Sequence, residues 1–293
     1  MANKKFSLLK SSNSSLVEED TIIKKKEDYP IIDTEVIEFI TKEFPKASIE
    51  IANSLTNLKN TLEKQFDTEI LEENIKKAIK IKNNERKALK EFYELGKLDP
   101  VPVTGVDIFK VLNGTTFAFD KEAIPKQLNE LVYKIKNEYA SVKKYESKPR
   151  ILITGCPLGT ATEKVIKAIE ENGAYVVAFE NCSGAKAIED LVDEDNPDVY
   201  DALAKKYLSI GCSCMTPNPN RIKLLDKMID EYKVDAVIDV ILTACHTYNV
   251  ETLSIKRFVN TKKDIPYMSV ETDFSNGDIG QLNTRMAAFI EML

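Results

Sequence analysis

Apolar residues in the second half of the chain form short continuous runs that alternate with amphipathic stretches. Three of the runs, ILITG, AYVVAFEN and AVIDVILTA, lie directly before Cys156, Cys182 and Cys245. Runs of this length, ended by glycine or asparagine and separated by helical spacing, are typical of parallel strands buried on both faces. The pattern therefore predicts a doubly wound parallel sheet of the Rossmann or flavodoxin-like α/β class. We expect strands at 150–155, 174–180, 235–242 and 265–270, and helices at 161–172, 185–192, 198–208, 220–232, 248–259 and from about 278.

The first half of the chain has a different pattern, with apolar residues at three- and four-residue spacing. Such spacing predicts amphipathic helices. The sequence before Pro30 is polar and rich in Lys, Ser and Glu, which is typical of a flexible lead-in. We therefore expect a lead-in over residues 1–30, a mainly helical subdomain over 31–148 and an α/β domain over 149–293.

Capping residues predict two helix starts in this first half. Asp and Thr side chains accept hydrogen bonds from the free N–H groups of a helix's first turn. Asp67 or Thr68 is expected to cap the helix whose apolar face begins near Ile70. Thr104 or Asp107 is expected to start the short helix that follows the proline-containing loop LDPVPVTGVD.

The overall composition narrows the possible functions. The hydrophobic fraction of 43% and the charged fraction of 30% are those of a soluble globular protein. The net charge of −6, with both signs mixed along the chain, excludes the basic footprint of nucleic-acid binding. No apolar run approaches the roughly 20 residues needed to cross a membrane, and the N-terminus has no apolar core of signal-peptide length. We therefore expect a cytoplasmic protein that binds neither nucleic acid nor membrane.

The five cysteines are confined to the second half of the chain. Parallel strands end at the same edge of a sheet, so Cys156, Cys182 and Cys245 are expected to meet there. Cys212 and Cys214, in the loop sequence GCSCM, can reach the same edge. An odd number of cysteines without an export signal indicates reduced thiols rather than disulfides. The sequence therefore predicts that all five thiols form a soft, metal-binding site.

The spacing of the cysteines does not by itself identify the metal. Zinc usually takes four ligands from paired C-x₂₋₄-C knuckles, and no such knuckle occurs. An iron–sulfur cluster accepts scattered thiolates, although the ferredoxin spacings are also missing. Any single cysteine can instead be a small buried side chain. The GCPLGT loop lacks both glycine-rich phosphate-binding patterns, which disfavours a nucleotide site.

Ionisable side chains accompany the cysteines. His246, the single histidine, directly follows Cys245 and is a candidate proton donor or a group that supports a ligand. Glu180 and Glu251 are candidate catalytic carboxylates near the same edge. Their alternative roles are structural: a hydrogen-bonded histidine and helix caps. Asp278 or Asn276 is expected to cap the last helix.

At these residues the chain resembles the 2-hydroxyacyl-CoA dehydratase and benzoyl-CoA reductase subunit family. The resemblance lies in TGCP, ENCSG, KYLSIGCSCM, ACHTYNVE and ETDFSNGDIGQLNTR, and it covers roughly residues 35 to 293. Within the family, these motifs look most like the branch of double-cubane-cluster proteins. Intact members carry an additional N-terminal α/β domain with further cluster cysteines, which this chain is expected to lack.

The resemblance implies an oxygen-sensitive enzyme component that carries a [4Fe-4S] or double-cubane cluster. It implies an ATP-dependent iron–sulfur activator as electron donor, an acyl-CoA or small-molecule substrate, and a homodimer or a heterodimer with a homologous subunit. By the same resemblance, Cys245 corresponds to the family's shared C-terminal cluster cysteine, while Cys156, Cys182, Cys212 and Cys214 look like thiols of the double-cubane branch. Two alternatives stay open: a non-catalytic or truncated partner subunit without a complete cluster, and a zinc-binding structural protein.

Overall fold

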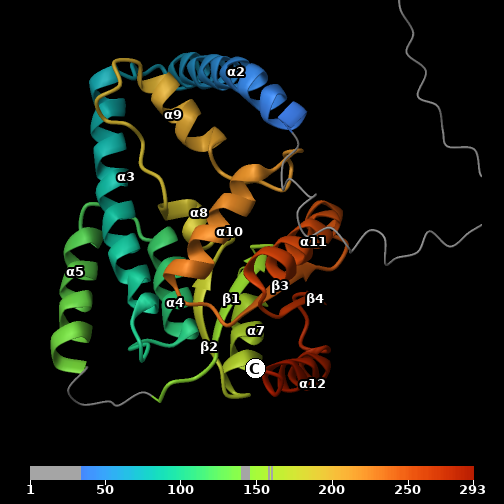
Figure 1. Ribbon diagram of the computed structural model, residues 1–293. Helices are drawn as coiled ribbons and strands as arrows, with labels where there is room; N and C mark the ends of the chain where they lie inside the picture. The colour runs from blue at the N-terminus through green and yellow to red at the C-terminus, as the bar shows by residue number, and fades with distance from the viewer. Residues whose placement is uncertain (1–33, 140–145, 158, 160) are drawn as a thin grey trace, which may run out of the picture.

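The computed structural model describes residues 34–139, 146–157, 159 and 161–293, with the backbone alone described for 34–45, 138 and 139. The predicted lead-in over residues 1–30 lies outside this range. Helices α2 to α5 come first, followed by strands that alternate with helices (Figure 1). The elements of the first half are α2 (Thr34–Phe66), α3 (Glu72–Tyr93), the 3₁₀ turn η1 (Glu94–Lys97), α4 (Gly105–Thr116), α5 (Ile124–Lys134) and the π-helical turn η2 (Ile135–Tyr139).

The second half builds a parallel sheet that, within the described residues, has four strands in the order β2-β1-β3-β4. The predicted doubly wound α/β fold is therefore confirmed. The strands are β1 (Arg150–Gly155), β2 (Tyr175–Phe179), β3 (Ala236–Leu242) and β4 (Tyr267–Thr272). The helices between and after them are α7 (Ala161–Glu170), α8 (Ala185–Ile188), α9 (Val199–Leu208), α10 (Pro219–Glu231), α11 (His246–Phe258) with the π-helical turn η3 (Val259–Lys263), and α12 (Ile279–Ile290).

The strand order determines where a ligand is expected. The chain leaves β1 toward β2 on one side and returns to β3 on the other, so the order reverses between β1 and β3. Right-handed crossovers then put α7 on one face and α10 and α11 on the opposite face. In sheets of this kind, ligands bind outside the carboxyl ends of the strands at such a reversal. The loops after β1 and β3 are therefore the first place to look for a functional site.

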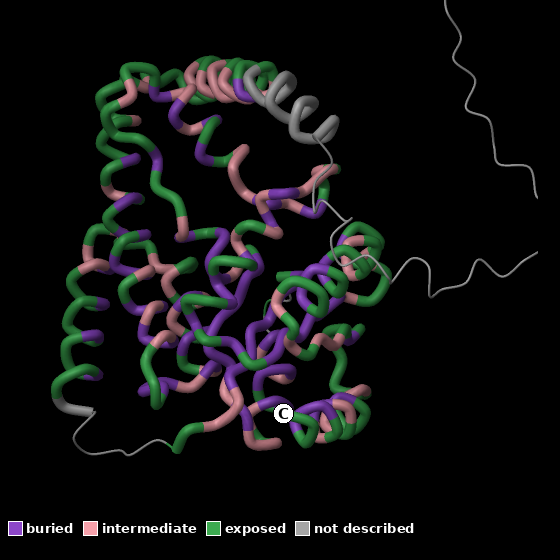
Figure 2. Tube along the Cα trace, viewed as in Figure 1, coloured by how far each residue is buried: buried purple, intermediate pink, exposed green. Residues whose placement is uncertain are grey.

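The core of the molecule is continuous across both halves of the chain. Buried apolar residues of α3, α4 and α5 belong to one cluster with those of the sheet and of α7, α10, α11 and α12. Figure 2 shows buried residues concentrated along the strands, while the described part of α2 is mostly exposed or half-buried. Gly96 in η1 illustrates how close the packing is, because a Cβ at this position would lie 2.2 Å from the carbonyl oxygen of Val177 in β2.

Helix starts and ends followed the capping rules only in part. Thr104 caps α4 as predicted: its hydroxyl accepts from the Asp107 N–H at 3.1 Å and the Asp107 carboxylate accepts in return from the Thr104 N–H. The predicted cap of α3 was wrong. Leu71 occupies that position with no side-chain hydrogen bond, and Asp67 and Thr68 lie in the turn after α2.

The helix predicted over 185–192 is only the single turn α8, and a distant side chain explains why. Asn83 of α3 donates to the Val192 carbonyl at 2.7 Å and accepts from the Val192 N–H at 3.0 Å. Both backbone groups of Val192 are thereby satisfied by a side chain that lies 109 positions earlier. The chain can leave the helix there without burying an unpaired polar group.

Candidate functional site at the carboxyl edge of the sheet

Two cysteines lie at the strand-order reversal. Cys156 directly follows β1, and its buried thiol accepts a hydrogen bond from the Leu242 N–H at the end of β3, at 3.3 Å. Cys245 precedes α11, and its thiol lies within hydrogen-bonding reach of that of Cys156. The sheet therefore joins two thiols that are 89 positions apart in the sequence.

The backbone around these thiols is held in special conformations. Gly155 has φ of +104°, and a Cβ there would lie 2.2 Å from the Val240 carbonyl oxygen, so only glycine fits. Ala244 has φ of 65°, a left-handed conformation that is uncommon for alanine. It turns the chain from β3 into α11 and places Cys245 at the helix N-terminus. Strained backbone of this kind clusters at functional sites.

Cys212 and Cys214 lie in the loop between α9 and α10. Their thiols are within hydrogen-bonding reach of each other. Asn218 fixes the loop by donating to the Cys212 carbonyl at 2.9 Å, and the Ser213 hydroxyl lies 3.4 Å from that of Thr247 on α11. The CSC loop is thereby tied to the helix that begins after Cys245.

Cys182 completes the group. It follows β2 and is exposed, and its thiol lies within hydrogen-bonding reach of the Tyr248 hydroxyl. The neighbouring thiols of Cys212, Cys245 and Cys182 raise the pKa of Cys214. The structure thus brings all five cysteines to one edge of the sheet, with Cys156 near Cys245, Cys212 near Cys214, and Cys182 near Tyr248.

This arrangement is not that of a site for one metal ion. Among the described residues, no group of three or more Cys, His, Asp or Glu side chains could hold a single ion. A structural zinc site needs four such ligands around one point. A group of several irons does not need four ligands around one point, because different irons take different thiolates. The role of the five cysteines as ligands stays a prediction.

The environments of the thiols differ. Burial raises the pKa of Cys156 to about 12, against the opposing effect of the Leu242 N–H. Burial also acts to raise the pKa of Cys245, but hydrogen bonds from Tyr248 N–H, Thr247 and Cys156 outweigh it and lower that pKa below its ordinary value. Cys245 is therefore the thiol of this pair that ionises first, which is the form that binds metals.

The three predicted catalytic side chains lie in two different settings. His246 is exposed as the first residue of α11. Glu180 is fully buried, 3.0 Å from the Lys186 ammonium, and Glu251 lies 2.5 Å from the guanidinium of Arg221. The two carboxylates are thus occupied in ion pairs, Glu251 being half-buried, and His246 is the most exposed of the three.

Arg221 is the residue that the sequence analysis missed. Its side chain is 1% exposed and lies between Glu180, Glu251 and Asp239, at 3.4, 2.5 and 3.7 Å. It also donates to the Thr154 hydroxyl at 2.9 Å. Burial raises the pKa of Asp239 to about 6, while the charge of Arg221 acts to lower it. A charged residue inside the apolar run AVIDVILTA was the one signal that could have indicated this network.

The buried charged residues around Arg221 contact Tyr248, which lies beside the thiols. The Arg221 guanidinium lies 5.0 Å from the centre of the Tyr248 ring, and the Lys186 ammonium lies 5.6 Å from it. Cations at this distance over an aromatic face are attracted to it. Tyr248 in turn contacts the Cys182 thiol. The buried charges therefore help to fix a side chain that touches the thiol edge.

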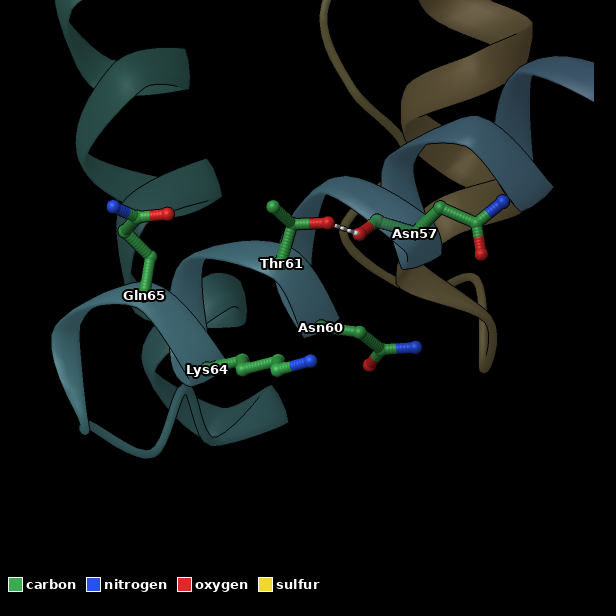
Figure 3. A pocket seen from close by; sticks show the side chains of 5 residues that line it. All are labelled: Asn57, Asn60, Thr61, Lys64 and Gln65. Atoms are coloured by element: carbon green, nitrogen blue, oxygen red, sulfur yellow. Dashed lines mark hydrogen bonds between the residues drawn. The ribbon is translucent and has the colours of Figure 1, made fainter.

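A cavity lies away from these residues, on α2. Its volume is about 790 Å³, and it is lined by Asn57, Asn60, Thr61, Lys64 and Gln65 (Figure 3). All five residues come from a single helix that contributes no cysteine. Nothing in this cavity combines burial, charge and reactive groups as the thiol edge does.

Fold and site together define a doubly wound α/β protein with a thiol-lined carboxyl edge at the strand-order reversal. The chain belongs to the family described as 2-hydroxyglutaryl-CoA dehydratase, D-component, whose model matches residues 19–293. The family predicted from the sequence motifs is thereby confirmed. Its placement in the double-cubane branch stays a prediction.

Three curated relatives illustrate this membership. The putative dehydratase subunit YjiM of Escherichia coli (strain K12) is 54% identical over 82% of this chain and 62% of its own length. The (R)-phenyllactyl-CoA dehydratase beta subunit of Clostridium sporogenes is 26% identical over 79% of this chain and 60% of its own length. A benzoyl-CoA reductase subunit of Thauera aromatica is 25% identical over 50% of this chain and 34% of its own length.

The chain therefore spans about 60% of the first two relatives. The described residues contain no helix with both the length and the apolar character needed to cross a membrane.

Proposed function

We propose that this chain is an iron–sulfur component of a 2-hydroxyacyl-CoA dehydratase-like system or of a related low-potential reductase. In this proposal Cys156, Cys182, Cys212, Cys214 and Cys245 hold a [4Fe-4S] or double-cubane cluster, and an ATP-dependent activator protein supplies the electron. The substrate is an acyl-CoA or another small molecule. A homologous subunit, or a second copy of the chain, is the expected partner.

One observation carries the proposal. Five thiols from four separate segments converge on the edge where a sheet of this topology binds its ligand. Membership in a dehydratase family supports the same chemistry.

Each part of the edge has a definite task in this proposal. Cys156 is held by the Leu242 N–H and fixes one point of attachment. Cys245 forms a thiolate more readily than an ordinary cysteine because its hydrogen bonds lower its pKa. The exposed His246 can exchange protons with solvent at the same edge. A bound cluster would supply the low-potential electron, at a potential adjusted by burial and by hydrogen bonds to sulfur.

The decisive experiment is anaerobic reconstitution followed by measurement of iron and acid-labile sulfide per chain, with EPR of the reduced protein. We expect a brown protein with an EPR signal, and loss of most of the iron in Cys245→Ser and Cys156→Ser. Ser213→Ala is the matched control, because it alters the same edge without removing a thiol. A colourless protein free of iron and sulfide would refute the proposal.

The same preparation tests the two alternatives. A zinc protein would bind zinc stoichiometrically instead of iron, although the described residues offer no site for a single ion. A non-catalytic partner subunit would fold without metal and bind an intact homologue. Its partner affinity would then be unchanged by Cys245→Ser.

A further inference from the structure

A cavity of about 450 Å³ adjoins the thiol edge and is lined by residues of α3, α8 and α9 and of the segment around the end of α4. Its size is in the range of ligand pockets. Cys182 lines it, and five of its side chains are cationic: Lys82, Arg86, Lys121, Lys186 and Lys206. The cavity is therefore a candidate binding site for an anion.

Three of these cations already have carboxylate partners. Lys82 and Lys121 both pair with Glu85, the second of them at 3.3 Å. Lys186 lies 3.0 Å from Glu180. Glu85 itself lines the cavity and is taken up by two of these pairs, which leaves Arg86 and Lys206 as the lining cations without an ion pair.

Arg86 and Lys206 are buried as whole residues, with exposures of 7% and 5%, and neither has a carboxylate within ion-pair distance in the described part of the chain. The Arg86 guanidinium makes hydrogen bonds to the Asn83 amide oxygen at 3.2 Å and to the Tyr207 hydroxyl at 3.3 Å. The Lys206 ammonium makes no hydrogen bond to any described residue and lies 4.7 Å from the Tyr207 ring. Much of the hydrogen-bonding capacity of both groups is unused.

Arg86 and Lys206 are neighbouring like charges, and neither has a carboxylate within ion-pair distance among the described residues. Burial and the charge of Arg86 together lower the pKa of Lys206 to about 8, with the charge of Asp190 acting in the opposite direction. Buried charges are normally paired, because removing a charge from water without compensation is costly. An anionic ligand between the two groups would provide the missing compensation.

We propose that this cavity binds the carboxylate or phosphate group of a small organic ligand between Arg86 and Lys206. A guanidinium presents parallel donors that match either oxyanion, and an ammonium adds a compact charge. The remainder of the ligand extends along the cavity toward Cys182. The binding of the oxyanion is independent of any cluster, whereas the delivery of the ligand's other end to the reactive edge rests on the proposed function.

Binding can be measured on the metal-free protein, so a failure to bind iron would not affect the result. Titration calorimetry with inorganic phosphate and with acetate, at constant ionic strength in chloride, distinguishes the two oxyanions. We expect at least one of them to bind, and Arg86→Met and Lys206→Met each to weaken it by about tenfold or more. Lys205→Met is the matched control, because Lys205 is exposed, pairs with Asp201 at 2.7 Å and does not line the cavity. Equal affinity in all variants, or no binding of either ion, would overturn the proposal.

Two further readouts do not depend on affinity alone. Lys206→Met removes a cation that repels Arg86 and has no ion-pair partner among the described residues, so its melting temperature without ligand should be at or above that of the unaltered protein. A fall in melting temperature beyond that of Lys205→Met would contradict this.

The longer acid hexanoate should slow alkylation of Cys182 by iodoacetamide but not that of Cys214, which does not line the cavity. Equal rates at Cys182 with and without hexanoate would refute the orientation toward the thiol edge.

Discussion

Replacing Arg221 by methionine is the sharpest test of the buried network beneath the thiols. Methionine keeps much of the side chain's apolar volume and removes its charge and donors. The change leaves Glu180, Glu251 and Asp239 without the guanidinium that lies within 3.7 Å of each of them. Two of these carboxylates are fully buried, so water cannot replace the lost partner.

The expected cost follows from that burial. Removing one partner from a buried ion pair destabilises a protein by about 3 to 5 kcal/mol. Asp239 adds a dependence on pH. Its pKa of about 6 lies above the ordinary 3.8, so the folded state binds its proton more tightly and loses stability as the pH rises through this range. Without Arg221 that pKa rises further, and the loss continues above pH 6.

Urea unfolding followed by circular dichroism at pH 5 and pH 8 measures both effects. Arg221→Met should be less stable by about 3 kcal/mol or more at pH 8, with a smaller deficit at pH 5. Lys223→Met, an exposed position on the same helix, is the matched control. In a double-mutant cycle with Glu180→Gln, we expect a coupling of about 0.5 to 3 kcal/mol. A loss below about 1 kcal/mol, or a deficit that does not change with pH, would refute the reasoning.

Three other predictions follow from the described contacts. Gly96→Ala should destabilise the protein by at least about 1 kcal/mol in urea unfolding, because its Cβ would meet a backbone carbonyl. Gly280→Ala, with no atom within 4 Å of the new Cβ, should be neutral or stabilising, and equal effects would contradict this. Burial raises the pKa of Glu170 to about 7, so its contribution to stability is present below pH 4.5 and is lost as the pH rises toward 7. Glu170→Gln should therefore reduce the change in unfolding free energy between pH 5 and pH 8 by up to about 3 kcal/mol. An unchanged pH profile would argue against this. In the metal-free protein, iodoacetamide should modify Cys245 faster than Cys156 at pH 8, as measured by peptide mass spectrometry, and the reverse order would contradict the assigned environments.

The fold was predictable because its signals are local. The apolar runs before Cys156, Cys182 and Cys245 mark strands, and parallel strands must end at one edge. The convergence of the cysteines could therefore be inferred from the positions of three short runs. The pairing of Cys156 with Cys245 could not, because it depends on β1 and β3 being neighbours, and no local pattern encodes strand order.

The charged residues of the site were harder to predict. Arg221 and Glu180 lie 41 positions apart and in different elements, so no local sequence pattern indicates that they pair. Glu180 and Glu251 were predicted as candidate carboxylates near the thiol edge, but their ion pairs with Arg221 form only when α10 is packed against the sheet. Asn83 shows the same limit, since its hydrogen bonds to Val192 end a helix that local spacing had extended.

The contacts between the two halves of the chain determine what can be separated experimentally. Tyr93 of α3 bonds both backbone groups of Phe179 at the end of β2, which is an edge strand of the sheet. The guanidinium of Arg150 in β1 donates to the carbonyl of Gly96 in η1. A fragment limited to residues 149–293 would expose these surfaces to water and would lose the wall of the cavity that holds its unpaired arginine. Truncation at the border between helices and sheet would thus yield an aggregation-prone, incomplete polypeptide rather than an independently folding domain.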